Sequence, residues 1–122
     1  MHMTSNIRQV GHVAVVDLSG RIMLGEESAS LRELVASLLS KGNRDILFNL
    51  AEVQYIDSSG LGALVSGMTS VRKQGGHLKL LKLTNKVTDV LQITKLYTVF
   101  DIFDDEQAAV DSFGPLATAT GA

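Results

Sequence analysis

The sequence predicts an α/β fold with a mixed but largely parallel sheet of four to five strands, an N-terminal β-hairpin and four helices. Three observations lead to this prediction. Strand-like and helix-like runs alternate along most of the 122 residues, an order that favours βαβ crossovers and parallel pairing. Residues 46–50 are almost continuously apolar, as expected for a strand covered on both faces. The first two strand-like runs are only two residues apart, which is typical of a hairpin.

The first half of the chain supplies the hairpin, one helix and the apolar strand. Residues 7–10 and 13–18 are rich in Val and Ile and predict two strands, with residues 20–25 as a loop. A helix is expected from about residue 26 to 41, ended by Gly42 in a left-handed conformation. The next strand is expected over residues 45–50. The buried face of the helix is predicted to carry five aliphatic side chains: Leu31, Leu34, Val35, Leu38 and Leu39.

The second half repeats the alternation. A helix that ends at about residue 73 is followed by a strand over residues 77–83, and Asn85 is expected to cap a short third helix. The last strand is expected over residues 99–103, and Asp104 and Asp105 favour the start of a fourth helix. Residues 114–122 predict a flexible tail. We therefore expect a single domain over residues 1–122, with its core at about 7–113.

The composition argues against several kinds of partner. The formal net charge is −2 and the pI is about 5.8, which gives no basic field for nucleic acid. The chain has no cysteine, and its three histidines lack ligand spacing, so we expect neither thiol chemistry nor a metal site. No apolar run approaches about 20 residues, and the N-terminus does not resemble a signal peptide. We expect a cytoplasmic protein without membrane association or a cofactor.

Two classes of enzyme are disfavoured because their motifs are missing. A serine hydrolase needs a glycine two residues before its nucleophile, whereas Ile56 occupies that place relative to Ser58. A nucleotide-binding enzyme needs a phosphate loop or a third glycine after Gly60-Leu61-Gly62. We therefore expect a binding protein and not an enzyme.

The most informative stretch is residues 55–64, Tyr-Ile-Asp-Ser-Ser-Gly-Leu-Gly-Ala-Leu. Asp57, Ser58 and Ser59 stand where the N-cap of a helix belongs. The pattern predicts two hydroxyls and a carboxylate at the positive end of that helix, which suits an anion, including a phosphate esterified to the serine itself. The apolar residues that follow recur at the spacing of one helical face: Leu61, Leu64, Val65 and Met68.

These residues resemble a known family. Asp-Ser-Ser-Gly-Leu-Gly at 57–62, preceded by Asn49-Leu50 and Tyr55-Ile56, is similar to the signature of the STAS domain, and more narrowly to that of the anti-sigma-factor antagonists of bacterial partner-switching systems. The resemblance covers residues 7 to 113, approximately. It implies helices packed mainly on one side of the sheet. It also includes Leu18-Ser19-Gly20, Gly75-Gly76-His77-Leu78 and Thr94-Lys95-Leu96.

The resemblance implies a regulatory switch. In this family the unphosphorylated antagonist binds an anti-sigma factor that is a serine kinase, and so frees the sigma factor. The kinase phosphorylates a serine of the motif, which ends the interaction, and a PP2C-type phosphatase restores it. By its position in the motif, the phosphoacceptor maps onto Ser58, with Asp57 and Ser59 as its neighbours at the interface. A monomer or weak dimer is expected.

The predicted partner surface includes the motif and part of the helix behind it. The helix side away from the apolar stripe is expected to carry small residues, including Gly62 and Gly67, which cost about 1 kcal/mol each relative to Ala and so indicate close approach of the domain's own sheet or of a partner. Arg21 stands where many family members have an acid, which leaves open a scaffold or ligand-sensing module of the same fold. The apolar run 22–24 is either a lid on the core or a partner patch. The full predicted set is Asp57, Ser58, Ser59, Gly60, Gly62, Ala63, Ser66 and Arg21.

Overall fold

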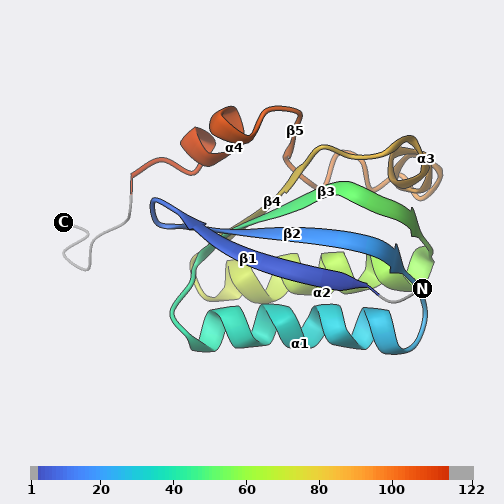
Figure 1. Ribbon diagram of the computed structural model, residues 1–122, viewed down its shortest axis with the longest axis horizontal. Coiled ribbons are helices and arrows are strands. Elements are labelled where there is room, and N and C mark those ends of the chain that lie inside the picture. The colour runs from blue at the N-terminus through green and yellow to red at the C-terminus, as the bar shows by residue number, and fades with distance from the viewer. Residues whose placement is uncertain (1–2, 116–122) are drawn as a thin grey trace.

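The computed structural model describes residues 3–115 and contains one five-stranded sheet, in which the strands lie in sequence order (Figure 1). The first two strands are antiparallel and form the N-terminal hairpin, and every other neighbouring pair is parallel. This confirms the predicted fold class. The strands are β1 (Thr4–Val10), β2 (Val13–Ile22), β3 (Asp45–Ile56), β4 (His77–Leu81) and β5 (Ile102–Phe103).

Helices cover both faces of the sheet unequally. Two long helices lie side by side against one face, and the last helix lies on the other (Figure 1). The third helix packs against β3. The helices are α1 (Glu26–Ser40), α2 (Ser58–Lys73), α3 (Asn85–Ile93) and α4 (Glu106–Ser112).

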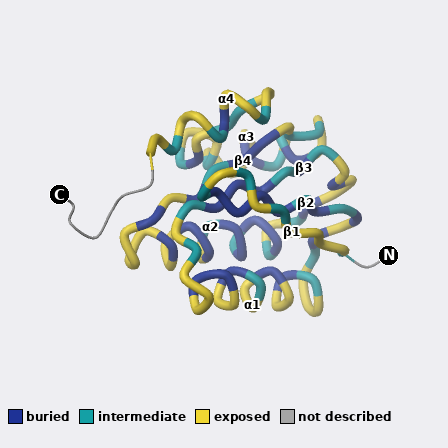
Figure 2. Tube along the Cα trace, turned by 60° about the vertical axis from the view of Figure 1, so that its left-hand side comes forward, coloured by how far each residue is buried: buried dark blue, intermediate teal, exposed yellow. Residues whose placement is uncertain are grey.

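The core follows the alternation of side chains along the strands. One set, including Val16 and Phe48, faces α1 and α2 and joins the larger apolar cluster. The other set, including Val15 and Leu47, faces α4 and joins a smaller cluster around Ala109. In Figure 2 buried positions run along the central strands and the inner sides of α1 and α2, while α4 is exposed on its outer side. The molecule therefore has one large apolar layer and one small one.

Three strands extend further than the sequence predicts. β1 begins at Thr4 and not at residue 7, and the extensions of β2 and β3 lead to the motif. β2 continues through Gly20 and Arg21 to Ile22, where a loop was expected, and β3 continues past Leu50 to Ile56. In the sequence, the polar residues that interrupt the second half of β3 give the pattern expected where a strand ends. The pairing survives them because β3 carries one extra residue at each of two register shifts, so both strands run on together until Ile22 lies opposite Ile56.

Three other boundaries need correction. β4 ends at Leu81 and not at residue 83, because Lys82 adopts a left-handed backbone conformation (φ 56°). β5 contains only Ile102 and Phe103, since the expected strand residues before them lie in turns and loop. The cap of α3 is Thr84 and not Asn85. The Thr84 hydroxyl accepts the N–H of Val87 in the first turn and donates to the C=O of Val53 in β3. Of the expected tail, residues 116–122 lie outside the described residues.

Candidate protein-binding site

The motif lies at the carboxyl end of the sheet. β2 and β3 end there as neighbours, β2 leads into the turn before α1, and β3 leads through Asp57 into α2 (Figure 1). The N-terminal ends of α1 and α2 therefore meet at this edge, which is where open α/β sheets place their functional groups.

Asp57 is the N-cap of α2 and bonds to two separate segments. Its Oδ1 accepts the N–H of Gly60 in the first turn of α2 at 2.8 Å, and its Oδ2 accepts the N–H of Leu24 before α1 at 2.9 Å. Its own N–H donates to the C=O of Ile22 at 3.2 Å. The capping role predicted from the sequence is thus carried out by Asp57, which also ties the β2–α1 turn to α2.

The charge of Asp57 is stabilised by these bonds. Partial burial would raise the pKa of its carboxyl, but the backbone N–H groups of Gly60 and Leu24 lower it more, so the net pKa lies below the usual range. The carboxylate is therefore ionised at neutral pH, and each of its oxygens accepts a backbone N–H.

Gly60 is the glycine that the geometry of the motif requires. A Cβ at this position would lie 2.2 Å from the C=O oxygen of Ile22 and 2.8 Å from side-chain atoms of Ile22 and Ile56. The start of α2 thus touches the last residues of β2 and β3 directly. Gly60 is buried and presents no side chain to a partner.

Ser58 and Ser59 occupy the first two positions of α2, and they differ in accessibility. Ser58 is exposed and Ser59 is half-buried. The serine predicted as the phosphoacceptor is therefore on the surface of the folded chain, directly after the capping residue.

The small residues further along α2 do not share one face, contrary to expectation. Gly62 has open space where a Cβ would stand and is half-buried. Ala63 is fully buried, so its side chain is not on the predicted surface, and Gly67 is buried against Val35 of α1 (3.1 Å from an added Cβ). The buried face of α2 is wider than the predicted stripe, because α2 packs against α1 as well as against the sheet. Ala63 and Gly67 belong to this wider buried face.

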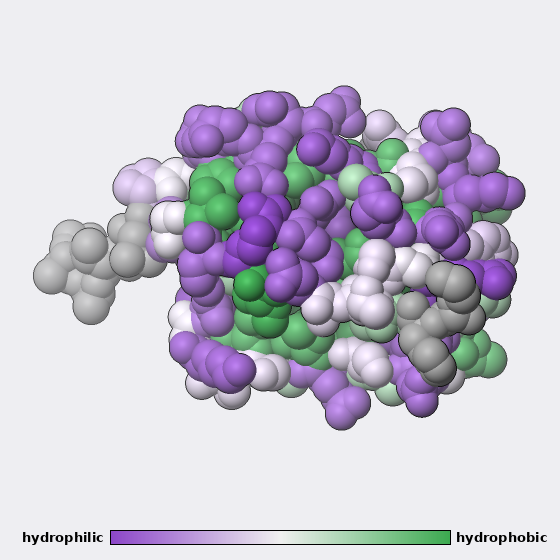
Figure 3. Space-filling model, viewed as in Figure 1, coloured by the Kyte–Doolittle hydropathy of each residue, from purple (hydrophilic) through white to green (hydrophobic). Residues whose placement is uncertain are grey.

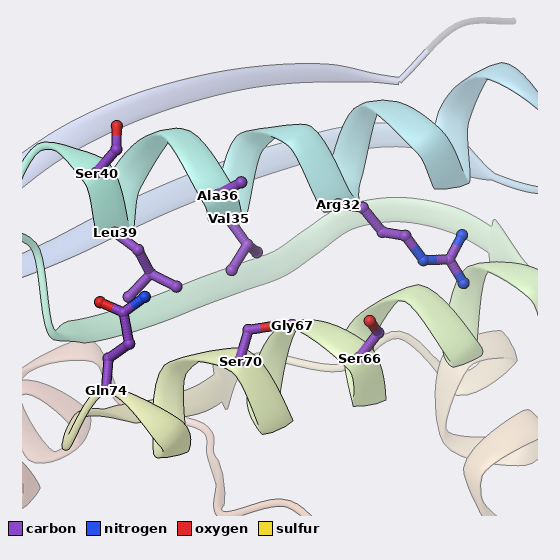
Figure 4. A pocket seen from close by; sticks show the side chains of 9 residues that line it. All are labelled: Arg32, Val35, Ala36, Leu39, Ser40, Ser66, Gly67, Ser70 and Gln74. Carbon is purple, nitrogen blue, oxygen red and sulfur yellow. The ribbon is translucent and has the colours of Figure 1, made fainter.

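Ser66 lies in a groove between α1 and α2, away from the motif. It stands eight residues after Ser58, about 12 Å along the helix. The groove has a volume of about 310 Å³ and is lined by polar and apolar side chains of both helices, with Arg32 at one end and Gln74 at the other (Figure 4). The structure therefore does not bring Ser66 together with Ser58.

The surface beside the motif includes residues that sequence reasoning missed or placed elsewhere. Arg21 is exposed on β2, and its guanidinium lies 5.6 Å from the ring centre of Tyr55 on β3. Leu24, in the turn before α1, is 75% exposed. The signal for Tyr55 was its place in the motif, but only the long pairing of β2 with β3 sets it beside Arg21.

The opposite end of the sheet gathers two of the histidines. His12 and His77 both contact the carboxylate of Asp45, at 2.9 and 3.3 Å. The topology thus joins residues that are scattered in the sequence. Among residues 3–115 no group of three or more His, Cys, Asp or Glu has a geometry that could hold a metal ion. Within the same residues, no helix combines the length and hydrophobicity needed to cross a bilayer.

The family model described as the STAS domain matches residues 4–109, which include every element except the end of α4. The chain belongs to the STAS-domain family. The anti-sigma-B factor antagonist of Bacillus subtilis is 32% identical over 110 residues, covering 90% of this chain and 99% of that protein. Members of this STAS group are regulatory binding proteins and not enzymes.

Two solved structures share the fold. A candidate anti-sigma factor antagonist from Thermotoga maritima superposes with a TM-score of 0.83 at 26% identity, covering 91% of this chain and 95% of that one. The phosphorylated form of the Bacillus cell fate determinant SpoIIAA has a TM-score of 0.69 at 21% identity, covering 89% and 98%. The similarity to SpoIIAA, at 21% identity, shows a shared fold and nothing more.

Proposed function

We propose that this protein is an anti-sigma-factor antagonist controlled by phosphorylation of Ser58. Unphosphorylated, it binds an anti-sigma factor that is a serine kinase and so frees a sigma factor. The kinase phosphorylates Ser58 and is released, and a PP2C-type phosphatase restores binding. The observation that supports this most is the exposed Ser58 directly after an ionised cap, in a chain similar over its length to a named anti-sigma factor antagonist.

A phosphate on Ser58 is compatible with the fold. It adds about −1.5 to −2 charges, and the end of α2 attracts a negative charge by about 0.3–1 kcal/mol at an exposed site. Repulsion by Asp57 opposes this, at about 1 kcal/mol for exposed charges some 4 Å apart in water. Since both oxygens of Asp57 already hold N–H groups, the cap stays in place. The two electrostatic effects nearly cancel, and the domain stays folded.

The same phosphate is costly at an interface. A partner surface that fits a bare hydroxyl would have to desolvate a dianion, and an unpaired buried charge costs about 3–5 kcal/mol. A micromolar complex is stabilised by only about 8 kcal/mol in total. Such a loss weakens binding by more than two orders of magnitude, so the switch acts at the surface and needs no backbone movement.

In this proposal the predicted partner residues have different roles. Ser58, Ser59, Gly62 and Arg21 offer accessible atoms near the end of α2. Asp57 and Gly60 support this surface from inside the fold. Asp57 caps the helix by accepting the N–H of Gly60, and Gly60 packs closely against the end of β2. In this proposal Ala63 acts only as a packed residue, and Ser66, which lies in the groove between α1 and α2, is outside the partner surface.

Affinity capture tests the proposal. Immobilised Ser58→Ala protein, which cannot be phosphorylated at this position, is expected to retain a serine kinase from a lysate of the source organism, and Ser58→Asp is expected not to. Ser59→Ala is the matched control, because it removes the neighbouring half-buried hydroxyl without adding charge, and it should still retain the kinase. With ATP, the captured kinase should add one phosphate to the wild type by intact mass and none to Ser58→Ala. Equal capture by Ser58→Ala and Ser58→Asp would contradict the proposal.

A scaffold or ligand-sensing module is the alternative, and the groove between α1 and α2 is the observation that favours it. Size-exclusion chromatography separates the scaffold role, because a scaffold subunit runs as a large assembly whereas we expect a monomer or weak dimer. Closing the groove by Ser66→Phe should leave kinase capture unchanged under our proposal. Loss of capture by that variant, with the fold intact by circular dichroism, would favour a role for the groove.

A further inference from the structure

β1 is an edge strand whose outer side is open. Among residues 3–115 it pairs with β2 alone, and five of its seven residues are exposed. The other edge of the sheet is formed by β5, which is only two residues long. A short edge strand offers little backbone for pairing, whereas a long one presents a row of unpaired N–H and C=O groups. The sheet therefore has one edge that can accept a further strand.

β1 lacks the features that usually prevent pairing at an edge, which are proline, a bulge and outward-facing charge. The only proline of the sequence is Pro115, and the register of β1 with β2 is continuous. The only charged residue of β1 is Arg8, whose guanidinium bonds to Asp17 and Glu106 at 2.7–3.2 Å. The edge is therefore regular and carries no unpaired charge.

The hairpin turn determines which backbone groups of β1 point outward. Gly11, with φ 63°, and His12 form a two-residue turn between Val10 and Val13, and such a turn closes on a hydrogen-bonded pair. Hydrogen-bonded and non-hydrogen-bonded pairs alternate along antiparallel strands, so every second residue counted back from Val10 bonds to β2. The residues between them direct their N–H and C=O groups away from β2: Ser5, Ile7 and Gln9.

Ile7 is the central residue of this outward set, and it is apolar. It lies opposite Val16, which belongs to the larger apolar cluster, so the Ile7 side chain is on the α1 side of the sheet. There it is 44% exposed. Figure 3 shows hydrophobic side chains between β1 and α1 on this face. A strand added at this edge would therefore cover apolar surface as well as pair with backbone groups.

We propose that two copies of this chain associate weakly through their β1 edges, so that the two sheets join into one. The β1 strands pair antiparallel about a two-fold axis at Ile7, and the outward N–H and C=O groups of each strand bond to those of the other. This interface does not involve Ser58, and the inference does not rest on the proposed function.

The edge is complementary to itself in this register. All seven residues of β1 are paired, and the two Ile7 side chains lie side by side. Arg8 lies opposite Asn6 of the second copy, so the two arginines do not face each other, as like charges directly opposite would destabilise the pair. The formal net charge of −2 adds little repulsion between the copies. A second copy is therefore the occupant that this edge fits.

The helices leave room for the pairing. Two copies joined at β1 have their β2 strands three strand spacings apart, which is about 14 Å. α1 packs against β2, so the two α1 helices lie at about this separation. Packed helices approach to about 8–10 Å, and the two α1 helices therefore do not collide.

Sedimentation equilibrium tests the association. Between about 10 µM and about 1 mM chain, the average mass should rise from 13.1 kDa toward twice that value. Ile7→Lys should raise the dimer Kd at least about tenfold, because it places two like charges opposite each other. Ile93→Lys is the matched control, since Ile93 is an exposed isoleucine (80%) on α3, and it should associate like the wild type.

Proline substitutions test the assignment of the backbone groups. The N–H of Ile7 points outward, so Ile7→Pro removes a donor from the dimer and none from the pairing with β2. Its dimer Kd should rise at least about tenfold. Asn6→Pro removes an N–H that bonds to β2, and it should lower the melting temperature more than Ile7→Pro does. Equal melting temperatures of the two variants would overturn the inference.

Amide hydrogen exchange shows the same alternation without a substitution. At high concentration the N–H groups of Ser5, Ile7 and Gln9 should exchange more slowly than at low concentration, whereas those of Asn6 and Arg8 should be protected at both. A dimer that survives Ile7→Lys, or protection without this alternation, would overturn the inference. So would a monomer at every concentration, which would leave the edge to a strand of a different protein.

Discussion

Asp57 and Arg8 each join segments that are far apart in the sequence, but they do so with different partners. Asp57 bonds to backbone N–H groups of Gly60 and Leu24 at the carboxyl end of the sheet. Arg8 bonds to carboxylates of Asp17 and Glu106, and so fastens α4 to the other face of the sheet. Side chains next to the Asp57 junction face outward, whereas the polar side chains at the Arg8 junction bond to one another.

The difference separates a binding surface from a structural clamp. At the Arg8 junction five donor–acceptor contacts, including one from Asn49 to Asp17, satisfy the polar side chains among themselves. At the Asp57 junction the neighbouring Ser58 and Leu24 remain exposed. Figure 3 shows the face that includes β1 and α4: it is mostly hydrophilic, with hydrophobic side chains gathered near the β1–β2 turn and between β1 and α1. Variants at the two junctions should therefore give different phenotypes.

The largest effect is expected for Gly60→Ala. The added Cβ would overlap the C=O oxygen of Ile22 at 2.2 Å, and a backbone group cannot rotate away. We expect the free energy of unfolding to fall by about 3 kcal/mol, measured by urea denaturation. A loss below about 1 kcal/mol would show that the end of α2 is not packed as closely as described.

Arg8→Ala should have the next largest effect. Arg8, Asp17 and Glu106 are each about a third exposed, so solvent screening limits the loss to about 1 kcal/mol. The amides of α4 should exchange faster, while kinase capture stays at the wild-type level. Loss of capture by a folded Arg8→Ala protein would contradict the division between the two junctions.

Acid should weaken the same clamp. Hydrogen bonds from Arg8 lower the pKa of Asp17 and Glu106 in the folded chain, against the opposing effect of burial. Groups with a lowered native pKa contribute stability above the unfolded value, and this stability is lost as pH falls through the native value. The melting temperatures of wild type and Arg8→Ala should therefore differ at pH 7 and converge below about pH 4. Parallel curves would contradict the assignment.

Gly62→Ala should have the smallest effect on folding, and of opposite sign. Open space surrounds the position, so alanine should stabilise the helix by about 0.8 kcal/mol. Because Gly62 is proposed to lie under the partner, the same variant should bind the kinase more weakly. A variant that is both more stable and equally tight would remove Gly62 from the surface.

Sequence patterns predicted the elements well because each follows from local spacing or capping. The stripe of α1, the left-handed Gly42 and the Asp105 cap of α4 are of this kind. The extensions of β2 and β3 were missed because cross-strand pairing and two register shifts decide them. The motif alone identifies Ser58. The position of Leu24 beside Asp57, and that of His12 and His77 beside Asp45, depend on contacts between residues about 30 or more apart in the sequence.

The most direct test of the switch compares one protein in two chemical states. Wild-type chain is phosphorylated by the captured kinase until intact mass shows a single added phosphate at Ser58. Its Kd for that kinase and its melting temperature are then measured beside those of the unmodified chain. The account predicts a Kd more than about 100-fold higher with a melting temperature within about 2 °C. Equal Kd values, or release accompanied by unfolding, would contradict it.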